Sequence, residues 1–218
     1  MDLITYGWKE NFSNAFYKKY NKDLYQPARI LSVTRGIYKI VCSKGVFNGE
    51  ISGAYAYLYT SKSDYPVIGD WVALKKDSIT GSSCIIDGII SRKNELCRNR
   101  PGENTEKQLL AVNLDYACII CGLDNDFNIH RIERYLSMVR GCKIEPVIIL
   151  SKTDLCRDHE QYVKQVILCD RNAAVFPVSS YTKFGIRELV KFFNKGKTIC
   201  FIGSSGAGKS TLINTLCG

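Results

Sequence analysis

A glycine-rich segment near the end of the chain has the pattern of a phosphate-binding loop. It reads Gly203-Ser204-Ser205-Gly206-Ala207-Gly208-Lys209-Ser210, the full G-x-x-x-x-G-K-[ST] motif, and Thr211 follows it. Glycines let backbone N–H groups turn inward around an anion, and the positive end of the following helix points at the same place. Lys209 adds a full charge for the β and γ phosphates, and Ser210 offers a hydroxyl to Mg²⁺. The segment therefore predicts a nucleoside triphosphate site.

Two polar loops earlier in the chain predict the base that this site reads. Ser151-Lys152-Thr153-Asp154 and Ser179-Ser180 each follow an apolar run, at the place where ligands gather in a parallel sheet. An ionised Asp154 only accepts hydrogen bonds, and guanine presents N1–H and its 2-amino group side by side, whereas adenine has no such edge. The stem of Lys152 would cover the base, and an N–H of Ser179 or Ser180 would donate to guanine O6. A solvated, charged turn is the alternative interpretation of this loop.

The second half of the chain predicts the sheet that positions these loops. Apolar runs at 117–121, 146–150, 174–178 and 198–202 alternate with helical patterns over 129–140, 162–167, 186–193 and 209–217. Continuous apolar strands separated by amphipathic helices indicate a parallel sheet with helices on both faces. Residues 111–218 are therefore expected to form an α/β P-loop domain.

The first half has a different pattern. Residues 1–97 contain a helical pattern at 9–20 and five β-rich runs separated by turn signals, at 29–34, 37–42, 46–53, 67–74 and 83–91. Within the fourth run, Gly69-Asp70 is expected to form a turn or bulge. Five short strands at regular spacing predict a small all-β barrel like the OB fold. Residues 98–110 are polar and broken by Pro101-Gly102, so we expect them to be a linker between the two domains.

Composition narrows the class of protein further. The 30 Lys and Arg against 21 Asp and Glu give a formal charge of +9, which favours polyanionic partners such as nucleic acid, although solubility explains it equally well. Of ten cysteines only Cys118 and Cys121 form a C-x-x-C pair, and their apolar surroundings favour buried thiols over zinc. The sequence has no membrane-length apolar run and no export signal, which together with many thiols predicts a cytoplasmic protein.

The motif order resembles one family. Base-reading loops that precede the phosphate loop reverse the usual GTPase order, and with a barrel in front the chain resembles the ribosome small-subunit-dependent GTPase A family, whose GTPase domain is circularly permuted. The segments that carry the resemblance are Val67-Ile68-Gly69-Asp70-Trp71-Val72, Ala111-Val112-Asn113-Leu114-Asp115, Ser151-Lys152-Thr153-Asp154, Val178-Ser179-Ser180 and 203–210. The resemblance implies a GTPase that uses GTP and Mg²⁺, yields GDP, and binds the small (30S) ribosomal subunit and its rRNA late in maturation. It implies a monomer with no membrane partner.

The chain departs from the family pattern at two places. Ser151 stands where the family usually has Asn or Thr, and the sequence ends at Gly218, before the family's switch regions and zinc-binding domain. We therefore expect Zn²⁺ only in that C-terminal domain, an incomplete sheet, and weak GTP binding and hydrolysis by this chain alone. None of the residues present can be assigned as the catalytic base. Two alternatives stay open: a P-loop ATPase or kinase with a β-rich accessory domain, and an RNA-binding barrel with a vestigial nucleotide domain.

Overall fold

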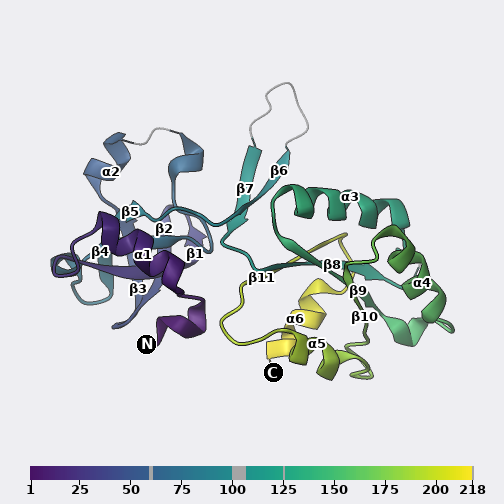
Figure 1. Ribbon diagram of the computed structural model, residues 1–218. Helices are drawn as coiled ribbons and strands as arrows, with labels where there is room; N and C mark the ends of the chain where they lie inside the picture. Colours follow the sequence, from purple (N-terminus) through teal and green to yellow (C-terminus); the bar gives the residue numbers. More distant parts are fainter. Residues whose placement is uncertain (59–60, 100–106, 125, 218) are drawn as a thin grey trace. The chain divides into compact units, whose positions relative to one another are not determined.

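The computed structural model describes residues 1–58, 61–99, 107–124 and 126–217 of the chain (Figure 1). They fall into two compact units, Met1–Leu114 and Asp115–Gly218. The first unit contains the predicted barrel and the second contains the predicted sheet.

Five strands of the first unit close into a barrel. They are β1 (Tyr25–Thr34), β2 (Ile37–Cys42), β3 (Gly45–Ile51), β4 (Trp71–Lys75) and β5 (Ser83–Ile89), in the order β1-β2-β3-β5-β4 with β4 paired back onto β1. Alternate side chains point inward, and the fully buried ones include Ala28, Ile30, Ile40, Cys42, Val72, Leu74 and Ile86. The predicted OB-like barrel is therefore confirmed.

Helices lie beside the barrel in the same unit. They are α1 (Glu10–Lys19), α2 (Gly53–Leu58) and the short 3-10 helices η1 (Leu3–Tyr6), η2 (Lys62–Asp64) and η3 (Lys76–Ser78). Helix α1 buries Phe12 and Phe16 against Trp71 of β4, so an aromatic cluster attaches it to the outside of the barrel.

Strand β4 begins later than the predicted run of 67–74. Residues 67–70 form a turn, which includes the turn or bulge expected at Gly69-Asp70, because Gly69 has a left-handed backbone with φ of 92°. The carboxylate of Asp70 accepts a hydrogen bond from the N–H of Val67 at 2.8 Å and closes this turn. The strand therefore starts at Trp71.

A two-stranded hairpin follows the barrel. It consists of β6 (Glu95–Asn99) and β7 (Lys107–Val112), which pair antiparallel and extend into the predicted linker of residues 98–110. Residues 100–106 of that linker, with Pro101-Gly102, lie outside the described residues.

The second unit contains one parallel sheet in the order β10-β9-β8-β11. Its strands are β8 (Tyr116–Gly122), β9 (Glu145–Ser151), β10 (Ala174–Pro177) and β11 (Ile199–Gly203). Between and after them lie α3 (Ile129–Gly141), η4 (Thr153–Leu155), α4 (Glu160–Cys169), α5 (Ile186–Phe192) and α6 (Lys209–Cys217). The parallel sheet is confirmed.

Helices cover both faces of this sheet (Figure 1). Ile119 and Cys121 of β8 pack in the cluster that contains α3 and α4, whereas Cys118 and Ile120 pack in the cluster that contains α5 and α6. Burial raises the pKa of both thiols of the C-x-x-C pair, so these cysteines behave as small apolar residues.

The described residues contain neither a membrane-spanning helix nor a cluster of metal ligands. None of their helices is long and apolar enough to cross a membrane. Within residues 1–58, 61–99, 107–124 and 126–217, no group of three or more His, Cys, Asp or Glu side chains is arranged to hold a metal ion.

Candidate nucleotide site

The phosphate loop joins the end of β11 to the start of α6. Gly203 has φ of 152°, and a Cβ added to it would lie 2.4 Å from the carbonyl oxygen of Ile120 on β8. Gly208, just before the helix, has φ of 88°. A side chain at either position would strain the backbone, so both glycines are required for the turn from strand to helix.

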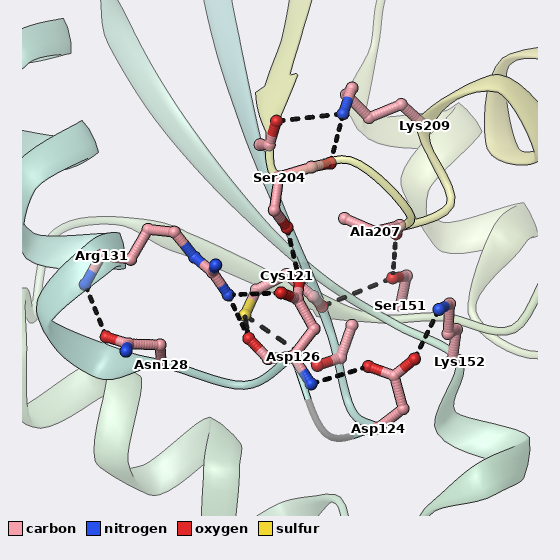
Figure 2. A network of polar contacts seen from close by, with 12 residues as sticks. Cys121, Asp124, Asp126, Asn128, Arg131, Ser151, Lys152, Ser204, Ala207 and Lys209 are labelled. Carbon is pink, nitrogen blue, oxygen red and sulfur yellow. Dashed lines mark hydrogen bonds and ion pairs between the residues drawn. The ribbon is translucent and has the colours of Figure 1, made fainter.

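Lys209 lies over its own loop. Its Nζ donates to the carbonyl oxygens of Gly203 at 3.0 Å and Ser204 at 2.5 Å (Figure 2). The ammonium group is therefore held where an anion bound in the loop would meet it. The side chains of Ser210 and Thr211 are exposed in the first turn of α6. The hydroxyl of Ser210 is an accessible oxygen ligand beside a phosphate site, which fits Mg²⁺.

Ser151 connects the predicted base loop to the phosphate loop. This residue is 5% exposed at the end of β9, and its Oγ donates to the carbonyl oxygen of Ala207 at 2.7 Å. Its hydroxyl is thus engaged with the phosphate loop across 56 positions of sequence. Ser151 therefore provides a hydrogen bond between the two loops.

Lys152 has a left-handed backbone, with φ of 61°, and its Nζ pairs with Asp124 at 2.5 Å. The hydrogen bond from Lys152 lowers the pKa of the Asp124 carboxyl below its usual value. Asp124 lies two residues after the end of β8, so this ion pair connects the loops that follow two neighbouring strands.

Asp154 and Ser179 form a second pair. Ser179 is fully buried, and its Oγ donates to Oδ1 of the exposed Asp154 at 2.5 Å. The N–H of Thr182 donates to the same hydroxyl oxygen at 3.1 Å. The buried hydroxyl therefore orients the carboxylate while solvent still reaches it.

Backbone hydrogen bonds also hold the loops that carry Asp154 and Ser179. The N–H of Thr153 donates to Val178 at 3.2 Å, which joins the two predicted base loops. The N–H of Ser179 donates to the carbonyl oxygen of Phe184 at 3.0 Å, so it is used within its own loop. Of the two N–H groups predicted to contact guanine O6, only that of Ser180 is then left as a candidate.

The acidic residues that follow β8 were not predicted as site residues. Oγ of Ser204 donates to Oδ2 of Asp126 at 2.5 Å, and Oδ1 of Asp126 pairs with Arg131 of α3 at 2.7 Å (Figure 2). The N–H of Asp126 in turn donates to Asp124 at 3.0 Å. The signal was available, because these two acids follow a buried parallel strand just as the predicted base loops do.

Comparisons with known proteins agree on one family. A family model described as RsgA GTPase matches residues 89–218. Proteins named small ribosomal subunit biogenesis GTPase RsgA are 32% identical in Opitutus terrae, over 100% of this chain and 61% of the relative, and 36% identical in Leptospira interrogans, over 99% and 58%. The chain thus spans about 60% of the length of these relatives.

Two solved structures share the fold. The crystal structure of YjeQ from Thermotoga maritima matches with a TM-score of 0.70 at 22% identity, over 88% of this chain and 65% of that chain. The crystal structure of YloQ, described as a circularly permuted GTPase, matches with a TM-score of 0.65 at 23% identity, over 87% and 63%. The predicted fold, a barrel followed by a circularly permuted P-loop GTPase domain, is confirmed.

Proposed function

The chain belongs to the RsgA GTPase family, and from this premise we propose that it binds GTP with Mg²⁺ and hydrolyses it to GDP during small ribosomal subunit assembly. The observation that carries the proposal is the hydrogen bond from Ser151 to Ala207. It joins a loop with the chemistry to read guanine to a loop with the chemistry to hold phosphates. The first loop would select guanine and the second would bind the phosphates, so GTP recognition needs both.

Each side chain has a role that follows from its contacts. Lys209 would exchange its two carbonyl partners for the β and γ phosphates, and Ser210 would hold Mg²⁺. When bound, Mg²⁺ neutralises charge on the phosphates. Asp154 would accept from N1–H and the 2-amino group of guanine, and the N–H of Ser180 would donate to O6. The stem of Lys152 would lie over the base.

The ribosomal part of the proposal comes from the relatives and from charge. The relatives are named for small ribosomal subunit biogenesis, and the formal charge of +9 suits contact with rRNA. We assign the RNA contact to the barrel, the fold class that binds oligonucleotides in many proteins. We further propose that the protein is a monomer and that it acts in the cytoplasm. The reducing conditions of the cytoplasm agree with free thiols such as those of Cys42 and Cys84.

Replacing Lys209 with Ala tests the nucleotide site. We expect the affinity for a fluorescent GDP analogue to fall about 10- to 100-fold, because one charge-assisted phosphate contact is lost. Unlabelled GTP should displace the analogue from the unaltered chain, and ATP at the same concentration should not. The matched control is Lys195→Ala, which removes an exposed charge from the same unit and should bind normally. Displacement by ATP as effective as by GTP would favour the ATPase or kinase alternative.

The salt dependence of binding to purified small ribosomal subunits tests the RNA contact. If lysines and arginines neutralise rRNA phosphates, affinity should fall at least about tenfold when salt rises fourfold, because bound counterions are released. Binding that ignores salt would point to protein contacts instead. Binding that depends on salt but is unchanged by Lys209→Ala and by added GTP would favour an RNA-binding barrel with a vestigial nucleotide domain.

A further inference from the structure

A series of hydrogen bonds connects the phosphate loop to the first turn of α3. Ser204 donates to Asp126 at 2.5 Å, and Asp126 pairs with Arg131 at 2.7 Å. NH2 of Arg131 also donates to the carbonyl oxygen of Asp126, and the N–H of Arg131 donates to the helix-capping Asn128 at 2.9 Å. The roles proposed above for the nucleotide site do not use Asp126 or Arg131.

Ser204 is fixed in the phosphate loop by contacts of both its side chain and its backbone. It is the residue after Gly203, and its own carbonyl oxygen accepts from Lys209 at 2.5 Å. The residue is therefore held at its side chain by Asp126 and at its backbone by Lys209. A shift of Ser204 would move both the carbonyl groups around Lys209 and the neighbouring N–H groups that face an anion. A loop that is already in its binding conformation binds more tightly, because less ordering is needed on binding.

The charge of Asp126 is compensated by a neighbouring cation. A carboxylate beside a polyphosphate site repels the ligand unless a cation compensates it. Arg131 provides that cation, and the two side chains are both about one-quarter exposed, at 25% and 24%. The pair is neutral overall, so Asp126 can accept from Ser204 without presenting a net charge to the phosphates.

We propose that Asp126 is a positioning residue for the phosphate loop, which it holds through Ser204, and that Arg131 neutralises its charge. The inference rests on the proposed nucleotide site. It places a determinant of GTP affinity 78 positions before Ser204 in the sequence, in the loop that follows β8. The relevant property of Ser204 is then its hydroxyl group and not its size.

Two substitutions of Ser204 by side chains of similar shape separate the effect of the hydroxyl group from the effect of side-chain size. Ser204→Thr keeps the hydroxyl and Ser204→Val lacks it, so we expect the Val variant to bind GTP and GDP about tenfold more weakly than the Thr variant. Asp126→Ala should weaken binding to a similar extent. The double variant Ser204→Val/Asp126→Ala should bind nucleotide no more weakly than the single variant with the lower affinity, because both changes remove the same hydrogen bond. Affinity is measured by titration of a fluorescent GDP analogue and by competition with GTP.

The control breaks an equivalent ion pair at the other end of α3. Arg140 pairs with Asp170 at 2.5 Å, and Asp170→Ala should lower the thermal midpoint measured by circular dichroism without changing GTP affinity. Equal affinity of the Thr and Val variants, or fully additive losses in the double variant, would overturn the inference. If Asp126→Ala does not fold, the Thr and Val comparison decides. An unaltered chain that binds neither GTP nor GDP would overturn the proposed function, and this inference with it.

Discussion

Replacing Asp154 with Asn is expected to change the base preference of the nucleotide site from guanine to xanthine. A carboxylate accepts two hydrogen bonds side by side, and guanine supplies two donors in that arrangement. The amide of Asn has one acceptor and one donor, so its NH₂ would oppose the 2-amino group of guanine. Xanthine has a carbonyl oxygen at that position, which accepts from the NH₂. Each charge-assisted bond contributes about 1.5–3 kcal/mol, so we expect GTP affinity to fall about 100-fold or more.

The structure explains why this effect should be large. Ser179 is fully buried and donates to Oδ1 of Asp154, so the carboxylate is already oriented before any base arrives. Oriented groups lose little freedom on binding, and the full strength of the two base contacts then contributes to affinity. Ser179→Ala should consequently weaken GTP binding less than Asp154→Asn does, because it loosens the carboxylate but keeps its charge.

The measurement is competition of GTP and xanthosine triphosphate against a fluorescent guanine nucleotide. Asp158→Asn is the matched control, because it removes the same charge from an exposed residue four positions later and should leave selectivity unchanged. Unaltered selectivity in the Asp154 variant would show that Asp154 does not read the base. That result would favour the alternative interpretation of residues 151–154 as a solvated, charged turn.

Local patterns predicted most of the second unit, because its elements are defined by short-range chemistry. Helix α6 begins at Lys209, where the phosphate motif requires a helix to begin, and it ends at Cys217 as expected. Strands β8 and β9 each extend one residue beyond their apolar runs at both ends, since the central residues of each strand are buried on both faces and must be apolar.

The missed features depend on contacts between distant residues. The bond between Asp126 and Ser204 spans 78 positions, so the place of Asp126 after a parallel strand marks it as a candidate site residue but does not identify its partner. The predicted start of strand β4 at residue 67 was wrong, although the turn expected at Gly69-Asp70 was confirmed. Val67 and Ile68 are apolar enough for a strand, but Gly69 and the side chain of Asp70 close a turn there. The role of Asp70 in that turn depends on Arg92, which is 22 positions away.

The ion pair of Asp70 and Arg92 carries the second large prediction. Asp70 is fully buried, and it accepts from Nε and NH2 of Arg92 at 2.8 and 2.9 Å. The guanidinium also donates to the carbonyl oxygens of Ser63 and Tyr65 and to the carboxylate of Glu95. Removal of Arg92 would leave a buried carboxylate without its cation, so we expect Arg92→Met to lower the free energy of unfolding of the first unit by about 3–5 kcal/mol.

Urea titration followed by tryptophan fluorescence measures this loss, because both tryptophans of the chain, Trp8 and Trp71, lie in the first unit. Glu95→Gln is the control, since Glu95 is about half exposed and its bond to Arg92 should contribute at most about 1 kcal/mol. A loss in Arg92→Met no larger than the loss in Glu95→Gln would contradict the prediction.

The unpaired charge of Asp70 is the expected cause of the instability of Arg92→Met. The pH dependence of the variant's stability therefore gives a second test. Burial raises the pKa of the Asp70 carboxyl, and Arg92 opposes that rise, so the pKa should increase further in Arg92→Met. A folded-state pKa above the unfolded value means that the folded state binds the proton more tightly. Lowering the pH from about 7.5 to about 5 should therefore restore part of the lost stability of the variant, measured against the unaltered chain at each pH. Asp70→Asn/Arg92→Met removes the buried charge itself, so it should be more stable than Arg92→Met at neutral pH and lack this pH dependence.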